Sequence, residues 1–198
     1  MSDIRETFSG GSPLDARSDI VNQRTGQRMR FINPDSGDDT GARGRGQTLR
    51  IECWSPAGGE REPNHTHPEQ VSGFEIISGE LAFWVDGKEF RAGPGETVTV
   101  PPAVNHRFWN PTGSEAHYVG TFGPALDTRH FFEVLFRLAN EGKLGKGGMP
   151  KPLHLPVLFR AFGREIRPTS PPWPLTRLTI AALAPIAGLR GYHDPADL

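Results

Sequence analysis

Short runs of alternating apolar and polar residues recur through the first two thirds of the chain. Thr48–Trp54 (TLRIECW) alternates strictly, as expected for a strand with one buried face. Two short strands are expected within residues 20–34, on either side of Thr25-Gly26. Further strands are expected at 74–77, 81–85, 88–91, 97–100, 106–109 and 117–122. Short strands at this spacing predict a small antiparallel barrel or sandwich.

Glycine and proline mark the turns between these strands. The chain contains 24 Gly and 19 Pro, which suits many short strands joined by turns. Asp86-Gly87 stands between two of the expected strands and predicts a two-residue hairpin. Residues 35–46 (DSGDDTGARGRG) predict a solvated loop, and their spacing matches no phosphate-binding loop.

After Pro124 the pattern changes to helical spacing. Thr128–Glu141 predicts a first helix, with Asp127 as N-cap and Gly142 as stop. A second helix is expected at 153–166, with Pro156 in its first turn, and a third at 175–189, broken or kinked near Pro185. These helices are expected to cover the barrel or to mediate dimerisation. The alternatives are a lid over a pocket or contact with a membrane surface.

The chain therefore divides into three parts. Residues 1–20 are polar without periodicity and predict a flexible N-terminal arm, although such an arm can also pair with a partner subunit. Residues 21–124 form the β-barrel. Residues 125–198 form a helical extension packed on the barrel or on a partner subunit, and we expect a homodimer.

Composition and charge exclude several classes of protein. The chain has 22 basic and 23 acidic residues, so nothing indicates a nucleic acid or an acidic membrane as partner. A single cysteine, Cys53, excludes an internal disulfide and is expected to pack in a strand. The polar N-terminus lacks an apolar signal region, and the run 175–189 is too short and interrupted for stable membrane insertion. We expect a cytoplasmic protein.

Three histidines suggest a metal site. His65 and His67 lie two residues apart, so in a strand their side chains point the same way. His106 follows after a Gly-Pro-rich turn and one further expected strand. Neutral imidazoles from neighbouring strands suit Fe, Mn, Ni, Zn or Cu. The alternative is a vestigial site whose histidines form hydrogen bonds inside a ligand-binding barrel.

The spacing around these histidines resembles the two sequence motifs of the cupin superfamily. The resemblance covers residues 45–123. Ser72 occupies the glutamate position of the first motif, and Ala103 replaces the inner glycine of the second. The positions that match are Gly59, His65, His67, Gly79, Gly95, Pro101, His106 and Asn110.

This resemblance implies a mainly β fold, the double-stranded β-helix or jelly-roll barrel of cupins, here with C-terminal α-helices. It also implies that His65, His67 and His106 bind the metal, with the usual carboxylate missing. Gln70 could turn inward as a neutral oxygen donor, or water could fill the position. Such a site keeps open coordination positions, which catalysis needs.

Strand parity predicts an apolar pocket around the histidines. Glu75 should point away from the metal, and one of His117 and Tyr118 should face inward. Such a pocket favours a small, largely apolar or aromatic ligand, although side chains of this kind can also simply fill the barrel. The predicted pocket residues are Ser72, Phe74, Ile76, Phe83, Val85, Val98, Val100, Phe108 and Tyr118.

The predicted site indicates a metal-dependent enzyme, an oxygenase or isomerase acting on a small organic molecule. Two other readings stay open. One is a non-catalytic small-molecule binder, and the other is a metal-free cyclase or isomerase that uses His65 or His106 as general acid or base. The sequence assigns no catalytic residue, and His130, His154 and His193 are interpreted as surface or packing residues.

Overall fold

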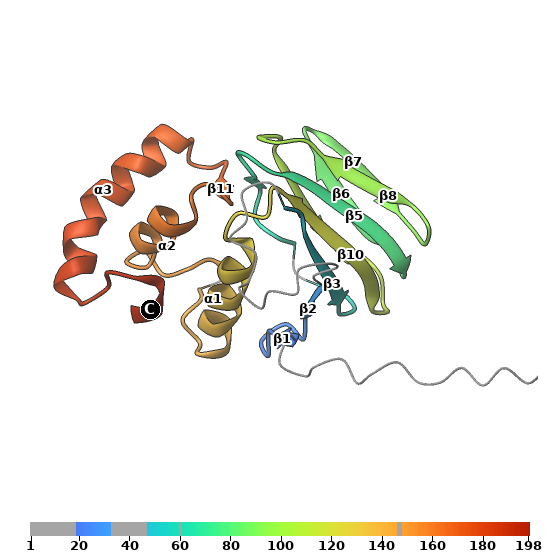
Figure 1. The fold of residues 1–198 in the computed structure, drawn as a ribbon, viewed down its shortest axis with the longest axis horizontal. Helices are drawn as coiled ribbons and strands as arrows, with labels where there is room; N and C mark the ends of the chain where they lie inside the picture. The colour runs from blue at the N-terminus through green and yellow to red at the C-terminus, as the bar shows by residue number, and fades with distance from the viewer. Residues whose placement is uncertain (1–18, 33–46, 60, 146–147) are drawn as a thin grey trace, which may run out of the picture.

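The computed structural model describes residues 19–32, 47–59, 61–145 and 148–198, and the statements below concern these residues. Two antiparallel sheets lie on one side of the molecule and three helices on the other (Figure 1). The predicted loop at 35–46 and most of the predicted arm lie outside the described residues. The first strand begins at Asp19, two residues before the predicted start of the barrel.

The larger sheet has six strands in the order β1-β2-β3-β10-β5-β8. Their bounds are β1 (Asp19–Val21), β2 (Arg28–Ile32), β3 (Leu49–Ser55), β10 (Ala116–Gly123), β5 (Val71–Ser78) and β8 (Thr97–Val100). The smaller sheet has the order β11-β4-β9-β6-β7. Its strands are β11 (Arg167–Pro168), β4 (His65–Thr66), β9 (His106–Trp109), β6 (Leu81–Val85) and β7 (Lys88–Ala92). The mainly β barrel predicted from the alternating pattern is confirmed.

Strand alternation produces the core between the sheets. β3 buries Leu49, Ile51 and Cys53 at every second position. On β5 Phe74 is buried while Glu75 is exposed, as the parity predicts. Alternate side chains of a strand point to opposite faces of its sheet. The core therefore forms between the apolar inner faces of the two sheets.

The hairpin between β6 and β7 has the predicted turn. Val85 pairs with Lys88, and Asp86 and Gly87 have φ angles of 45° and 86°. Positive φ at both central residues is the type I′ geometry that Asp-Gly favours, because its twist matches that of the flanking strands.

The three predicted helices are present with shifted bounds. They are α1 (Thr128–Asn140), α2 (Leu155–Phe162) and α3 (Trp173–Leu189). Asp127 takes the N-cap position of α1 without a capping side-chain hydrogen bond, and α2 is shorter than predicted because the chain turns at Gly163 towards β11. The sequence predicts a break or a kink at Pro185, and the break is excluded because α3 continues through this residue: one missing N–H does not end a helix of 17 residues.

The helices pack in sequence outward from the barrel. α1 contributes Phe136 to the barrel core and Val134 and Leu138 to a second apolar cluster with α2. α3 packs on α2 and lies outermost (Figure 1), leaving Leu178 and Leu189 exposed. Within the part of the chain that the structure describes, no helix is both long and apolar enough to cross a membrane.

The helical extension also contributes to the barrel itself. After α2 the chain forms β11, which pairs antiparallel with β4. Pro168 lies opposite His65, and Arg167 lies opposite Thr66. The extension predicted at 125–198 therefore contributes one strand to the smaller sheet in addition to its helices. That strand lies beside the histidines.

Candidate metal centre

The three predicted histidines converge inside the barrel. His65 on β4 lies directly opposite His106 on β9 in the sheet register, and His67 follows β4. The ring centroids are 4.4 Å apart for His65 and His106, 5.1 Å for His65 and His67, and 5.2 Å for His67 and His106. One candidate ligand nitrogen from each ring lies within 4.8 Å of the other two, and all three residues are buried.

Each imidazole is oriented by a backbone carbonyl. A carbonyl can only accept a hydrogen bond, so each Nδ1 must carry the proton and each Nε2 keeps its lone pair. The Nε2 of His106 is buried without a hydrogen-bond partner. This is the arrangement by which metal-binding histidines are usually fixed. The Nδ1 to carbonyl-oxygen distances are 2.9 Å for His65 and Pro63, 2.5 Å for His67 and Glu165, and 2.9 Å for His106 and Val104.

Burial keeps these imidazoles neutral. It lowers the pKa of His67 to about 4 and the pKa of His65 well below its usual value, with His67 and His106 as further causes for His65. Burial also lowers the pKa of His106. Because ligation requires the neutral ring, the site is prepared for a cation at neutral pH without first losing protons.

Gln70 and Ser72 supply further unpartnered oxygen atoms. The Nε2 of Gln70 donates to the carbonyls of Pro124 (2.7 Å) and Ala125 (3.2 Å) and to the hydroxyl of Thr128 (2.8 Å). Three acceptors on one side fix the orientation of the amide and leave its Oε1 buried without a partner. The Oγ of Ser72 is also buried without a partner. Unpaired buried oxygens are costly, so an ion or a water molecule beside either atom would stabilise it.

A cavity of about 460 Å³ adjoins the histidines. All three histidines line it, together with Phe74, Phe108 and Tyr118 from the predicted pocket. Its outer wall comes from the apolar faces of α1 and α2, helices that the sequence predicted to cover the barrel or mediate dimerisation, with a lid over the pocket as an alternative. These helical residues are Phe131, Phe132, Leu135, Phe136, Leu155, Leu158, Phe159 and Phe162. The volume suits a small organic molecule.

The other predicted pocket residues are not part of the cavity lining. Ile76, Phe83 and Val100 are fully buried in the core, and Val85 and Val98 pack against it. Ser72 is also buried. Gln70, predicted as a fourth metal ligand, lies beneath the start of α1 and does not line the cavity either. Parity identifies the inward face of a strand, but the lower part of a small barrel is filled by its own side chains.

Two acidic residues near the cavity were not predicted. Glu62 lines the cavity from the loop before β4. Glu165 is buried at the entrance to β11, and its carbonyl orients His67. Glu62 lies outside every predicted helix and strand, and the interaction of Glu165 uses its backbone, so no side-chain pattern signals either residue.

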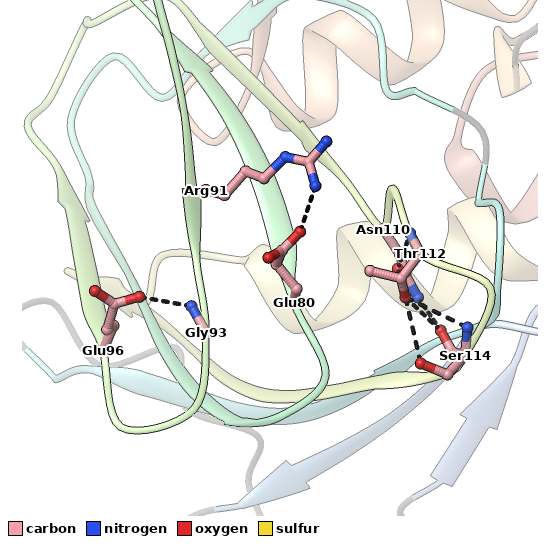
Figure 2. Close-up of polar contacts among 7 residues, drawn as sticks. All are labelled: Glu80, Arg91, Gly93, Glu96, Asn110, Thr112 and Ser114. Atoms are coloured by element: carbon pink, nitrogen blue, oxygen red, sulfur yellow. Dashed lines mark hydrogen bonds and ion pairs between the residues drawn. The ribbon is translucent and has the colours of Figure 1, made fainter.

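Asn110, the last position of the second motif, has a structural role. Its Nδ2 donates to three carbonyls, those of Ser55, Pro56 and Ser114, and its Oδ1 accepts from Thr112. Figure 2 shows the contacts among Asn110, Thr112 and Ser114, together with the Glu80–Arg91 ion pair and the bond from the Gly93 N–H to Glu96. These contacts fix turns at the ends of the strands.

A family model described as a cupin domain matches residues 54–122. That stretch contains all three histidines and most of both sheets. Residues 54–122 form a cupin domain. The matched region begins within β3 and ends in β10, so the helical extension lies outside it.

Known proteins resemble this cupin domain only in part. An oxidoreductase of Arthrobotrys oligospora is 28% identical over 123 residues, 58% of this chain and 47% of that protein. The quercetin 2,3-dioxygenase of Bacillus subtilis is 30% identical over 95 residues, 46% of this chain and 25% of that enzyme. The chain thus spans half or less of these relatives. An RmlC-like cupin structure from Shewanella frigidimarina is 18% identical, covering 61% of this chain and 96% of its own, with a TM-score of 0.46.

Proposed function

We propose that this protein is a metal-dependent enzyme of the oxygenase or isomerase class, acting on a small, largely apolar or aromatic molecule. His65, His67 and His106 would hold a divalent transition metal, Fe, Mn, Ni, Zn or Cu, and Gln70 Oε1 would be the fourth donor. The observation that carries the proposal is the set of three imidazoles, each with its Nδ1 engaged by a carbonyl and with their ligand nitrogens gathered at one point.

The donor set fits such a metal. Imidazole nitrogen and amide oxygen suit first-row transition metals, and no carboxylate is needed to hold them. When bound, the metal would act as a Lewis acid or redox centre with coordination positions open to the cavity. The protein's own residues would hold the ligand against the aromatic walls and exclude water.

The cavity supports the proposed substrate class. Phe74, Phe108 and the phenylalanines of α1 and α2 surround a space of about 460 Å³ next to the histidines. Aromatic walls favour a flat apolar ligand, and few polar groups remain to orient it. The relatives named as an oxidoreductase and as a dioxygenase acting on quercetin add support for oxygen chemistry.

A non-catalytic binder is the second candidate. The buried Ser72 in the position of the usual carboxylate ligand favours it, because three neutral ligands hold a cation more weakly than a set that includes an anion. In this case the barrel would be a container for the same class of molecule, without turnover.

Metal analysis tests the proposal. The purified protein should contain about one transition-metal ion per chain by element-specific analysis, and His67→Ala should lose most of it. His130→Ala is the matched control, since this histidine lies on α1 with its side chain 45% exposed. Equal metal content in the wild type and His67→Ala would refute the ligand assignment.

Turnover separates the two candidates. The metal-loaded protein would be screened against phenolic compounds with and without oxygen. Oxygen-dependent consumption indicates an oxygenase, oxygen-independent conversion indicates an isomerase, and tight binding without conversion indicates the binder.

A further inference from the structure

Glu62 stands apart from the other groups around the cavity. Of the described residues that line the cavity, it is the only carboxylic acid. It lies three residues before His65, in the loop that leads into β4. An acid facing an aromatic cavity is costly unless it is neutral or has a partner.

The surroundings of Glu62 favour its neutral form. Burial raises the pKa of Glu62 to about 8. The titratable groups that face it are the thiol of Cys53 on β3 and the hydroxyl of Tyr118 on β10. The nearest cation in sequence, Arg61, stacks its guanidinium on Trp109 at 4.3 Å. At neutral pH Glu62 is therefore mainly a carboxylic acid with an O–H to donate.

Two other polar groups of the wall are already engaged. The Tyr118 hydroxyl interacts with the side chains of Ser55 and Cys53. All donor and acceptor groups of the Asn110 amide are used in its turn. Glu62 lines the same cavity and has no hydrogen bond or ion pair with another described residue, so a ligand in the cavity can reach its carboxyl group.

We propose that Glu62 is a specificity-determining residue, a neutral carboxylic acid that donates a hydrogen bond to an acceptor oxygen of the cavity's ligand. The preferred ligands are then aromatic molecules with a carbonyl or similar oxygen, and carboxylates are disfavoured once Glu62 ionises. This inference rests on the proposed function only in taking the cavity as the ligand site.

The pH range of this effect can be assigned. The pKa of Cys53 is about 12 and that of Tyr118 is raised well above its usual value, both through burial. Burial lowers the pKa values of the three histidines below their usual range. Arg24 also lines the cavity. A binding transition near pH 8 would therefore belong to Glu62.

A pair of matched probes tests the proposal without requiring turnover. 2-Acetylnaphthalene and 2-ethylnaphthalene have nearly the same shape, neither titrates, and only the first has an acceptor oxygen. Binding would be followed by quenching of tryptophan fluorescence from pH 6 to 9.5. The wild type should bind the ketone roughly fivefold to tenfold more tightly than the hydrocarbon below pH 8, and should lose this preference above it.

Two variants complete the test. Glu62→Gln keeps a donor of the same size, so the ketone preference should persist and become independent of pH. Glu62→Leu should abolish the preference at every pH while still binding the hydrocarbon, which also shows that the cavity is intact. Equal affinities for both probes in the wild type, or a preference that survives in Glu62→Leu, would overturn the proposal. Each binding measurement is repeated after treatment with a metal chelator, so that coordination of the ketone by a bound metal cannot produce the preference, and the proposed function is tested separately.

Discussion

The Nδ1 of His67 lies 2.5 Å from the carbonyl oxygen of Glu165, a residue 98 positions later in the chain. The same segment forms β11 and pairs with β4, which carries His65. The helical extension therefore helps to build the candidate metal centre, because it fixes the tautomer and ring orientation of one proposed ligand.

Replacing Glu165 should weaken metal binding although its side chain is not a proposed ligand. Its Oε1 accepts a hydrogen bond from the N–H of Asp127 at 3.0 Å, which holds this segment in place. We expect Glu165→Ala to lower Zn²⁺ affinity by about tenfold, measured by competition with a chromogenic chelator. Arg164→Ala is the control, since it removes only an exposed ion pair with Glu69 and should leave affinity unchanged. Equal affinities in both variants would show that the Glu165 carbonyl keeps its position without the side chain.

Restoring a carboxylate at position 72 should strengthen the site. Ser72 is fully buried, its Oγ has no partner, and it occupies the position that holds glutamate in the cupin motif. Ser72→Glu should raise metal affinity at least about tenfold by adding an anionic ligand, and should lower the melting temperature of the metal-free protein by burying an unpaired charge. Ser72→Gln adds the same volume without the charge and should destabilise the protein without the gain in affinity. If both variants bind metal alike, position 72 does not face the ion.

Sequence patterns predicted the strands and the three histidines, but they could not place residues along the barrel axis. Phe74 and Ile76 share one face of β5, yet only Phe74 lines the cavity. Parity distinguishes the two faces of a strand and says nothing of depth. The boundary between cavity and packed core depends on how the opposing sheet and the helices fill the space.

The strand that the extension adds to the barrel, β11, could not be predicted from the sequence either. β11 has only two residues, Arg167 and Pro168, so it is too short for any period to show.

Glu62 lies in an irregular loop and has no neighbour in sequence that marks it. Burial raises its pKa, and Cys53 on β3 and Tyr118 on β10 come close to it only after folding.

Replacing Ala103 by glycine, the residue that the motif has at this position, should stabilise the protein. Its φ is 61°, in the left-handed region, and its N–H donates to the carbonyl of His67 at 2.8 Å, so the turn cannot easily relax. A residue with a Cβ pays roughly 1 kcal/mol for this conformation. Ala103→Gly should therefore raise the free energy of unfolding by up to about 1 kcal/mol in urea denaturation. Ala57→Gly, at an exposed turn without positive φ, should be neutral or destabilising, and an equal gain in both variants would contradict the explanation.

The raised pKa of Glu62 predicts a pH dependence of stability. In the unfolded chain this carboxyl has its ordinary pKa of 4.5, whereas burial raises it to about 8 in the folded protein. Between these values the folded state binds the proton more tightly, so the contribution of this group to stability is complete below pH 4.5 and is lost as the pH rises to about 8. The difference in unfolding free energy between Glu62→Gln and the wild type should therefore grow in favour of the variant from pH 5 to pH 8 and then level off. Urea denaturation of both proteins at matched pH values measures this difference, and other titrating groups cancel because the two chains share them. A difference that stays constant over this range would mean that Glu62 is ionised in the folded protein, and the hydrogen-bond donor proposed for the cavity would be absent at neutral pH.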